Sequence, residues 1–275
     1  MRVRILGILA AVICAASSAA AQTLPGSGDG IRNFGVWLDD ASVTPPGGGW
    51  VSMSLGYYRS DLFRETDLPI ADAGMGLSKR FQAGFMAPIY NVGPPGGPTT
   101  HGLGDFYIYT KYQLRDPADA KNNGLGFAIA PLIEVLSANQ PEGAGRMHWA
   151  LPVSLELQRP GWRMYGSTGF FSRGSLFASA ALERSVTEKM WVTGTLSDSY
   201  STKSDVVPIP DLSRNRMDIS GGAGYMVTGA VAVFGTIGRT ISMHDVNSTN
   251  LALTFGASVN IAAPPPPKAR HRPRR

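Results

Sequence analysis

The segment from Asn250 to Ile261 alternates strictly between apolar residues and residues that are polar or small. Its apolar positions are Leu251, Leu253, Phe255, Ala257, Val259 and Ile261. A period of two separates alternate side chains onto opposite faces only when the backbone is a β-strand. The segment therefore predicts a long strand with one apolar face and one polar face.

The same alternation recurs along most of the chain, which predicts an all-β fold. We expect about twelve strands, near residues 49–59, 70–78, 80–90, 103–114, 123–136, 146–158, 162–172, 175–186, 190–200, 215–226, 230–241 and 250–261. Most connections alternate between short turns and longer segments rich in Gly, Pro, Asp and Asn, such as Ser60–Pro69. Short periplasmic turns and longer extracellular loops are typical of transmembrane up-and-down antiparallel β-barrels. The pattern predicts such a barrel, located in the outer membrane.

The first 22 residues have the organisation of a signal peptide. Arg2 and Arg4 precede an apolar run from Ile5 to Ala16, which is followed by small residues. This run is shorter than the roughly 20 residues that a membrane-spanning helix needs. Cys14, the only cysteine, lies within it, so the mature chain is expected to have neither a disulfide nor thiol chemistry.

The charge balance argues against a nucleic-acid partner. The chain has 25 basic and 20 acidic residues. Seven of the basic residues lie in the signal peptide or among the last eight residues, which leaves 18 basic against 20 acidic side chains in the body. The body therefore has a net charge of about −2 and no basic face of the kind that binds nucleic acid.

Two segments are expected to lie outside the barrel wall, which we place at residues 49–262. Residues 23–48 are rich in Gly and Pro and either remain in the periplasm or fold into the barrel as a plug. Residues 263–275 form a Pro-rich basic tail in the periplasm. This tail is either simply solvated or contacts an acidic partner such as cell-wall polymer or anionic lipid.

The positions of the tryptophans distinguish a membrane barrel from a soluble one. A soluble lipocalin-like barrel directs its apolar residues inward around a core. Trp50, Trp162 and Trp191 each begin a strand directly after the proposed periplasmic side. Their common height predicts an aromatic girdle at the membrane interface.

Charged residues on the polar faces of the strands are expected to face the lumen, because an Arg or Lys facing lipid at mid-depth costs about 2–4 kcal/mol. The candidate pore-lining residues are Asp72, Arg80, Asp105, Lys111, Glu134, Arg146, Glu156, Arg163, Glu183, Asp218 and Arg239. They either set ion selectivity as rings of fixed charge or pair across strands and fill the lumen. Their mixed signs predict weak selectivity between cations and anions.

A family resemblance lies at residues 102–112, which read GLGDFYIYTKY. A GLGD motif followed by an alternating strand that ends in KY resembles the outer-membrane transporter family associated with meta-pathway phenol degradation. The resemblance implies a barrel that passes small, rather apolar or aromatic solutes. Independently of it, Gly102 and Gly104 predict a bulge or close backbone approach where a loop enters a strand.

The remaining motifs give little support for an enzyme. The histidines and carboxylates lack the spacing of a metal site, and no cofactor motif is present. His148 has Ser154 six residues away, beyond hydrogen-bond reach along one strand. His244 lies in a loop with Asp245 and Ser248, where a nucleophile set could be assembled.

The sequence thus predicts a non-enzymatic outer-membrane channel or transporter for passive movement of small solutes. Its expected partners are outer-membrane lipid and the solute. Two alternatives stay open, a closed structural or anchoring barrel and an outer-membrane lipid-modifying enzyme.

Overall fold

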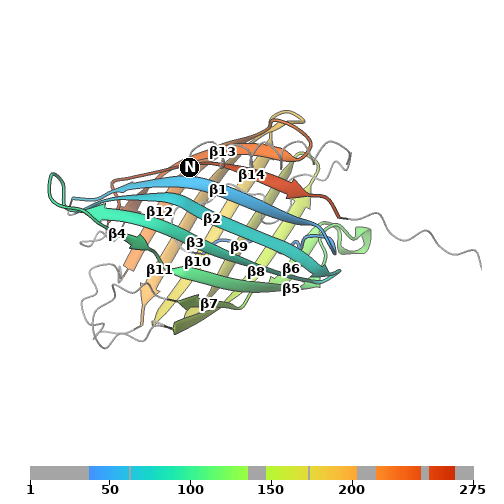
Figure 1. The fold of residues 1–275 in the computed structure, drawn as a ribbon. Coiled ribbons are helices and arrows are strands. Elements are labelled where there is room, and N and C mark those ends of the chain that lie inside the picture. The colour runs from blue at the N-terminus through green and yellow to red at the C-terminus, as the bar shows by residue number, and fades with distance from the viewer. Residues whose placement is uncertain are drawn as a thin grey trace, which may run out of the picture.

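Fourteen β-strands pair in order around a closed antiparallel barrel (Figure 1). The computed structural model describes residues 37–61, 63–135, 147–172, 174–202, 215–242 and 248–263. The last strand pairs with the first from Ile261 opposite Gly49 to Leu251 opposite Arg59, which closes the wall. The strands are β1 (Gly49–Arg59), β2 (Arg64–Ser78), β3 (Phe81–Gly93), β4 (Thr100–Leu103), β5 (Phe106–Arg115), β6 (Leu125–Ile129), β7 (Leu132–Val135), β8 (Met147–Arg159), β9 (Trp162–Phe171), β10 (Ser175–Ser185), β11 (Met190–Ser201), β12 (Asn215–Met226), β13 (Val231–Ser242) and β14 (Leu251–Ile261).

The fourteen strands make a twelve-stranded wall, as the sequence predicts, because two strands of the wall are interrupted. β4 and β5 both pair with β3, and β6 and β7 both pair with β8. Each break lies against a proline in the neighbouring strand: Gly104 N–H donates to the Pro88 carbonyl (2.8 Å), and Ala130 N–H donates to the Pro152 carbonyl (2.9 Å). Proline has no N–H to return, so the ladder is irregular at both points.

One expected loop is mostly strand. β2 begins at Arg64, so only a few residues remain of the loop predicted over Ser60–Pro69. The register of β2 against β1 and β3 shifts just before Ile70. The irregularity takes Pro69 out of the hydrogen-bond ladder and lets the strand continue beyond it.

The two faces of the wall differ in chemistry as the alternation predicts. In β8, Leu151 and Leu155 are exposed on the outer face, while Ser154 and Glu156 are buried on the inner face. The outer face of β14 carries Phe255 in the same way. A continuous belt of exposed apolar side chains on a closed barrel matches the lipid-facing surface of an outer-membrane protein.

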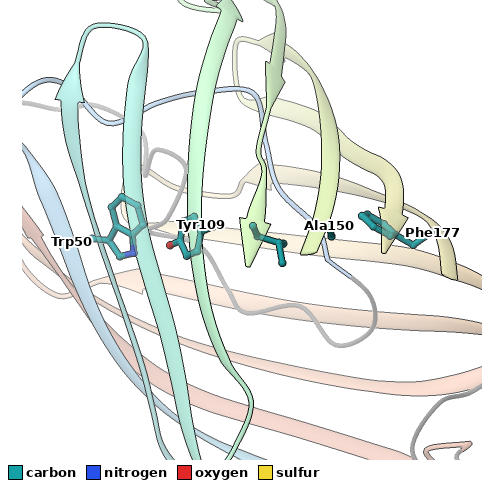
Figure 2. Close-up of a cluster of buried hydrophobic side chains, with 5 residues drawn as sticks. Trp50, Tyr109, Ala150 and Phe177 are labelled. Carbon is teal, nitrogen blue, oxygen red and sulfur yellow. The ribbon is translucent and has the colours of Figure 1, made fainter. Parts of the chain in front are cut away.

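The predicted tryptophan girdle is wrong for two of its three members. Trp162 is 38% exposed, but Trp50 and Trp191 are 1% and 4% exposed and lie on the inner face. The cross-strand partner of each is a glycine, Gly74 for Trp50 and Gly224 for Trp191. The indole ring occupies the space above that glycine, where an added Cβ would lie 2.2 Å from the ring in both cases. Figure 2 shows Trp50 in an inner cluster with Tyr109, Ala150 and Phe177.

Helical structure in the described residues is confined to one short 3-10 turn, Ala120–Asn122, in a connection between β5 and β6. No helix among those residues has the length and apolar character needed to cross a bilayer. The predicted signal peptide and residues 23–36 of the N-terminal segment lie outside the described residues. So does the basic tail from residue 264 onward.

Candidate functional site in the lumen

Most of the predicted lumen residues are buried on the inner face of the wall. They are Asp72, Lys111, Glu134, Glu156, Arg163, Glu183 and Asp218. Asp105 is half-buried in the break between β4 and β5. Arg146 lies outside the described residues. The structure sorts the buried seven into three separate groups.

Two of the predicted residues do not face the lumen. Arg80 is exposed in the two-residue turn between β2 and β3. Arg239 is exposed on the same face of β13 as Val233 and Ile237, so its predicted inward orientation is wrong. Arg239 lies near the end of β13, where an outward Arg costs only about 0–1 kcal/mol because it reaches the interface.

The first group is an ionic cluster that joins the wall to the N-terminal segment of residues 37–48. Lys111 of β5 donates from Nζ to Asp39 Oδ1 (2.7 Å) and to Asp40 Oδ1 (3.0 Å). Arg163 of β9 donates from one terminal nitrogen to Asp40 Oδ2 (2.9 Å). Asp40 therefore bridges two cations that belong to different strands of the wall.

Glu183 and Glu156 complete the ionic cluster. Arg163 makes a two-pronged contact with its cross-strand partner Glu183, with nitrogen–oxygen distances of 2.9 and 3.1 Å. Glu156 lies 3.7 Å from the same guanidinium. Its other oxygen accepts from Ala41 N–H (3.1 Å) and Ser42 Oγ (2.8 Å). A carboxylate of the wall thus binds the backbone of the N-terminal segment.

Neutral side chains of the wall bind the same segment along its length. Gln113 Nε2 donates to the Ala41 carbonyl (3.1 Å), and Gln82 Oε1 accepts from Thr44 N–H (2.8 Å). Beyond Thr44, the segment runs against the end of β2, where Gly47 N–H donates to the Gly76 carbonyl and Gly76 N–H donates to the Gly48 carbonyl. A Cβ on Gly76 would lie 2.1 Å from the Thr44 carbonyl oxygen, so this approach requires glycine.

The second group combines carboxylates with aromatic rings. Asp72 accepts from Trp50 Nε1 (3.3 Å) and from the Tyr109 hydroxyl (3.2 Å). Glu134 accepts from the Tyr107 hydroxyl (2.7 Å). The ring of Trp37, from the N-terminal segment, packs edge-on against Tyr109 with centroids 5.4 Å apart. This group presents an aromatic surface with its hydroxyl and indole donors directed to acids.

The third group is small and lies on the other side of the barrel. Asp218 of β12 accepts from Arg216 Nε (2.8 Å) and from Thr240 Oγ1 (2.7 Å). Both partners come from the same part of the wall. Arg216 also donates to Thr249 Oγ1 (3.3 Å), so the group joins β12 and β13 to the residues just before β14.

Burial alters the ionisation of the N-terminal segment. Desolvation raises the pKa of Asp39 to about 6, well above the ordinary value of 3.8, although Lys111 opposes the rise by stabilising the carboxylate. The charge of Asp40, the adjacent acid, contributes to this rise. The segment therefore takes up protons in mildly acidic conditions when it lies in the lumen.

The structure describes one of the two nucleophile sets considered for an enzyme, the pair of His148 and Ser154. His148 Nδ1 lies 3.5 Å from Ser172 Oγ, and Ser154 is six residues away on the same strand. His244 and Asp245 lie outside the described residues. Within the residues that the structure covers, no three His, Cys, Asp or Glu side chains are grouped as a metal site requires.

The lumen residues predicted from the sequence do not include Asp39 and Asp40, the two acids of the N-terminal segment that bind Lys111 and Arg163. Asp40 is separated from Arg163 by 123 residues and from Lys111 by 71, so no local pattern connects them. The available signal was an Asp39–Asp40 pair close to Trp37 within a segment otherwise rich in Gly and Pro. The sequence contained the acids, but their partners depend on how the wall closes.

Comparison with solved structures gives the same fold. A crystal structure of an outer membrane channel from Pseudomonas putida F1 matches with a TM-score of 0.60 and 12% identity, over 81% of this chain and 98% of that one. The NanC porin matches with a TM-score of 0.55 and 8% identity, over 76% and 98% of the two chains. The KdgM porin matches with a TM-score of 0.51 and 8% identity, over 77% and 100%.

No protein-family model matches the sequence, and no curated protein matches it. At these identities the structural matches establish the fold. The match to the Pseudomonas channel agrees with the barrel fold that the resemblance of residues 102–112 implies. The chain has the fold of an outer-membrane, porin-like β-barrel, closed by twelve antiparallel strands.

Proposed function

We propose that this protein is a passive channel that lets small solutes cross the outer membrane. The observation that carries the proposal is the contrast between the two faces of one closed wall. Exposed apolar side chains cover the outside, while serines, threonines and charged residues line the inside. A polar interior is characteristic of barrels that hold a water-filled channel.

The N-terminal segment of residues 37–48 is proposed as a plug that narrows this channel. Its two acids bind Lys111 and Arg163, and its backbone binds Glu156 and Gln113. All four wall residues lie on strands β5, β8 and β9, so the segment is held against one side of the lumen. A plug held by ion pairs and hydrogen bonds can be released without unfolding the wall.

The class of solute is proposed from the family resemblance and from the aromatic side chains of the lumen. The family resemblance implies small apolar or aromatic solutes, and the lumen offers aromatic surface at Trp37, Tyr107, Tyr109 and Phe177. Ring stacking against such side chains contributes about 0.5–1.5 kcal/mol beyond burial. We propose aromatic solutes as one class to test. The other prediction, a periplasmic contact made by the basic tail, is independent of the pore.

The deciding experiment is single-channel recording of the refolded mature protein in a planar bilayer, beside a variant that lacks residues 23–48. Stable steps in both proteins support a channel, and larger or more frequent steps in the deletion variant support the plug. Silence from both proteins, with the heat-modifiable gel mobility of a folded barrel, contradicts the channel. Such silence would favour a closed anchoring barrel. Hydrolysis of lipid by the wild type, lost in His148→Ala, would favour an enzyme.

A further inference from the structure

The inner face of β11 to β14 and of β1 carries many small hydroxyl side chains beside the rings of Trp50, Trp191 and Phe234, and we call it the hydroxyl wall. The hydroxyl residues of this wall are Ser52, Ser54, Thr193, Thr195, Ser197, Ser199, Ser220, Thr236, Thr240, Thr254 and Ser258, all of them buried. Glycines occupy inward positions between them, such as Gly222 opposite Thr193 and Gly256 opposite Ser54. Side chains of this size extend less far from the wall than the long side chains of the opposite side.

The opposite side of the lumen is filled. Strands β5 to β10 direct long side chains inward, including Lys111, Glu156 and Arg163, and residues 37–44 are bound on top of them. On the hydroxyl wall, the inward charges are Arg216 and Asp218, which pair with each other at 2.8 Å. The fixed charges of the lumen are therefore concentrated on the side that the N-terminal segment covers.

Several hydrogen-bonding groups of the hydroxyl wall point inward without a protein partner. Thr193 Oγ1, Ser197 Oγ, Ser258 Oγ and the indole Nε1 of Trp191 are buried and make no hydrogen bond within the described part of the chain. A buried polar group without a partner costs about 1–3 kcal/mol. A passing molecule that offers hydroxyl groups can satisfy them.

The wall itself shows how such hydroxyls bind a neutral group. Ser167 and Ser179 are cross-strand partners, and both donate to the carbonyl oxygen of Trp37 at 2.8 Å. Ser197 is the next partner in the same row, opposite Ser179. Ser167, Ser179 and Ser197 thus lie side by side on β9, β10 and β11. The first two hydroxyls bind the N-terminal segment, and the Ser197 hydroxyl, which has no hydrogen-bond partner among the described residues, can bind a solute.

We infer that solutes cross the barrel along the hydroxyl wall and that this path favours uncharged, hydroxyl-bearing molecules such as small polyols and neutral sugars. The inference rests on the proposed channel function and adds a second solute class to the aromatic one proposed above. Uncharged serines and threonines exchange hydrogen bonds with such a molecule at little cost, but they do not compensate the lost hydration of an ion. The ionic cluster then serves to hold the N-terminal segment and does not line the path.

The location of the path is tested by cysteine labelling, since Cys14 in the predicted signal peptide is the only native cysteine. Ser258→Cys places a thiol on the hydroxyl wall, and Ser154→Cys is its matched control. Both serines are 0% exposed and make no hydrogen bond to the described residues, but β14 and β8 lie six strands apart around the barrel. In a planar bilayer, a water-soluble uncharged methanethiosulfonate is expected to reduce the conductance of Ser258→Cys and to leave Ser154→Cys unchanged.

Equal block of both variants, or block of Ser154→Cys alone, overturns the location. If the unmodified wild type never conducts, the proposed function has failed, and labelling measured by mass spectrometry still decides where water enters. Modification of Ser258→Cys but not of Ser154→Cys then supports the location. Protection of both thiols contradicts it.

The solute class is tested by liposome swelling with arabinose and with gluconate, which are similar in size but differ in charge. The wild type is expected to admit arabinose faster. Combining Thr193→Val with Ser197→Ala keeps the side-chain shapes, removes both hydroxyls and is expected to slow arabinose about fivefold, from a typical hydrogen-bond contribution. Thr193→Ser retains the hydroxyl and is expected to match the wild type. Equal rates for the two solutes, or no slowing in the double variant, would refute the class.

Discussion

Replacing Asp40 with asparagine should release the N-terminal segment while leaving the barrel wall intact. Asp40 is 3% exposed, and its two oxygens bind Lys111 at 3.0 Å and Arg163 at 2.9 Å. Asparagine has the same shape but no charge, so both ionic contacts become weaker together. The wall does not need Asp40, because Arg163 keeps Glu183 as a partner.

The expected loss of docking free energy depends on which acidic partners Lys111 and Arg163 keep. Removing one partner of a buried ion pair typically costs about 3–5 kcal/mol, most of it from the charge left unpaired. Lys111 still pairs with Asp39 at 2.7 Å, and Arg163 still pairs with Glu183, so each buried cation keeps an ion-pair partner. We therefore take the lower end, about 3 kcal/mol, which corresponds to a shift of roughly 150-fold in the ratio of docked to released segment.

Single-channel recording measures this shift as the fraction of time spent at the conductance of the variant lacking residues 23–48. Asp40→Asn is expected to raise that fraction strongly. Asp119→Asn is the matched control, because Asp119 is exposed in a turn and its side chain only caps a short 3-10 turn, which asparagine also caps. An open fraction in Asp40→Asn no higher than in this control would refute the ionic hold on the segment.

Three other outcomes are expected. The docked Asp39 carboxyl, which faces Lys111 and Asp40, has a pKa near 6 against 3.8 in the free segment, so the docked state binds more protons between these values. Docking should be strongest near pH 4 and weaken toward pH 6, seen as an open fraction that rises with pH; a fraction independent of pH contradicts this. Gly76→Ala should loosen the segment, because the new Cβ would lie 2.1 Å from the Thr44 carbonyl oxygen, and higher protease sensitivity of residues 37–48 with unchanged heat-modifiability is the expected readout. Leu155→Arg places a charge on the exposed apolar face of β8 and should destabilise the folded barrel by about 2–4 kcal/mol in urea titration, whereas Leu155→Ile should stay near wild type.

The wrong faces predicted for the buried tryptophans and for Arg239 share one cause. Alternation assigns each residue of a strand to one of two faces by its position. The wrong predictions chose the face from the chemical type of the side chain. In β1, the period of two places Trp50 on the same inner face as Ser52 and Ser54, although its aromatic ring suggests a girdle at the membrane interface. In β13, the period of two places Arg239 on the same outer face as Val233 and Ile237, although its charge suggests the lumen. In both strands the period of two was the better guide.

The sequence by itself determined the strand pattern, the number of strands in the wall and the polarity of its two faces. A period of two is local, and each strand displays it without reference to its neighbours. The tertiary structure decided what the inward side chains do. Whether Lys111 and Arg163 line an open pore or bind Asp39 and Asp40 depends on contacts across 71 to 123 residues. Such contacts exist only once the barrel has closed and its lumen has brought distant strands around one segment.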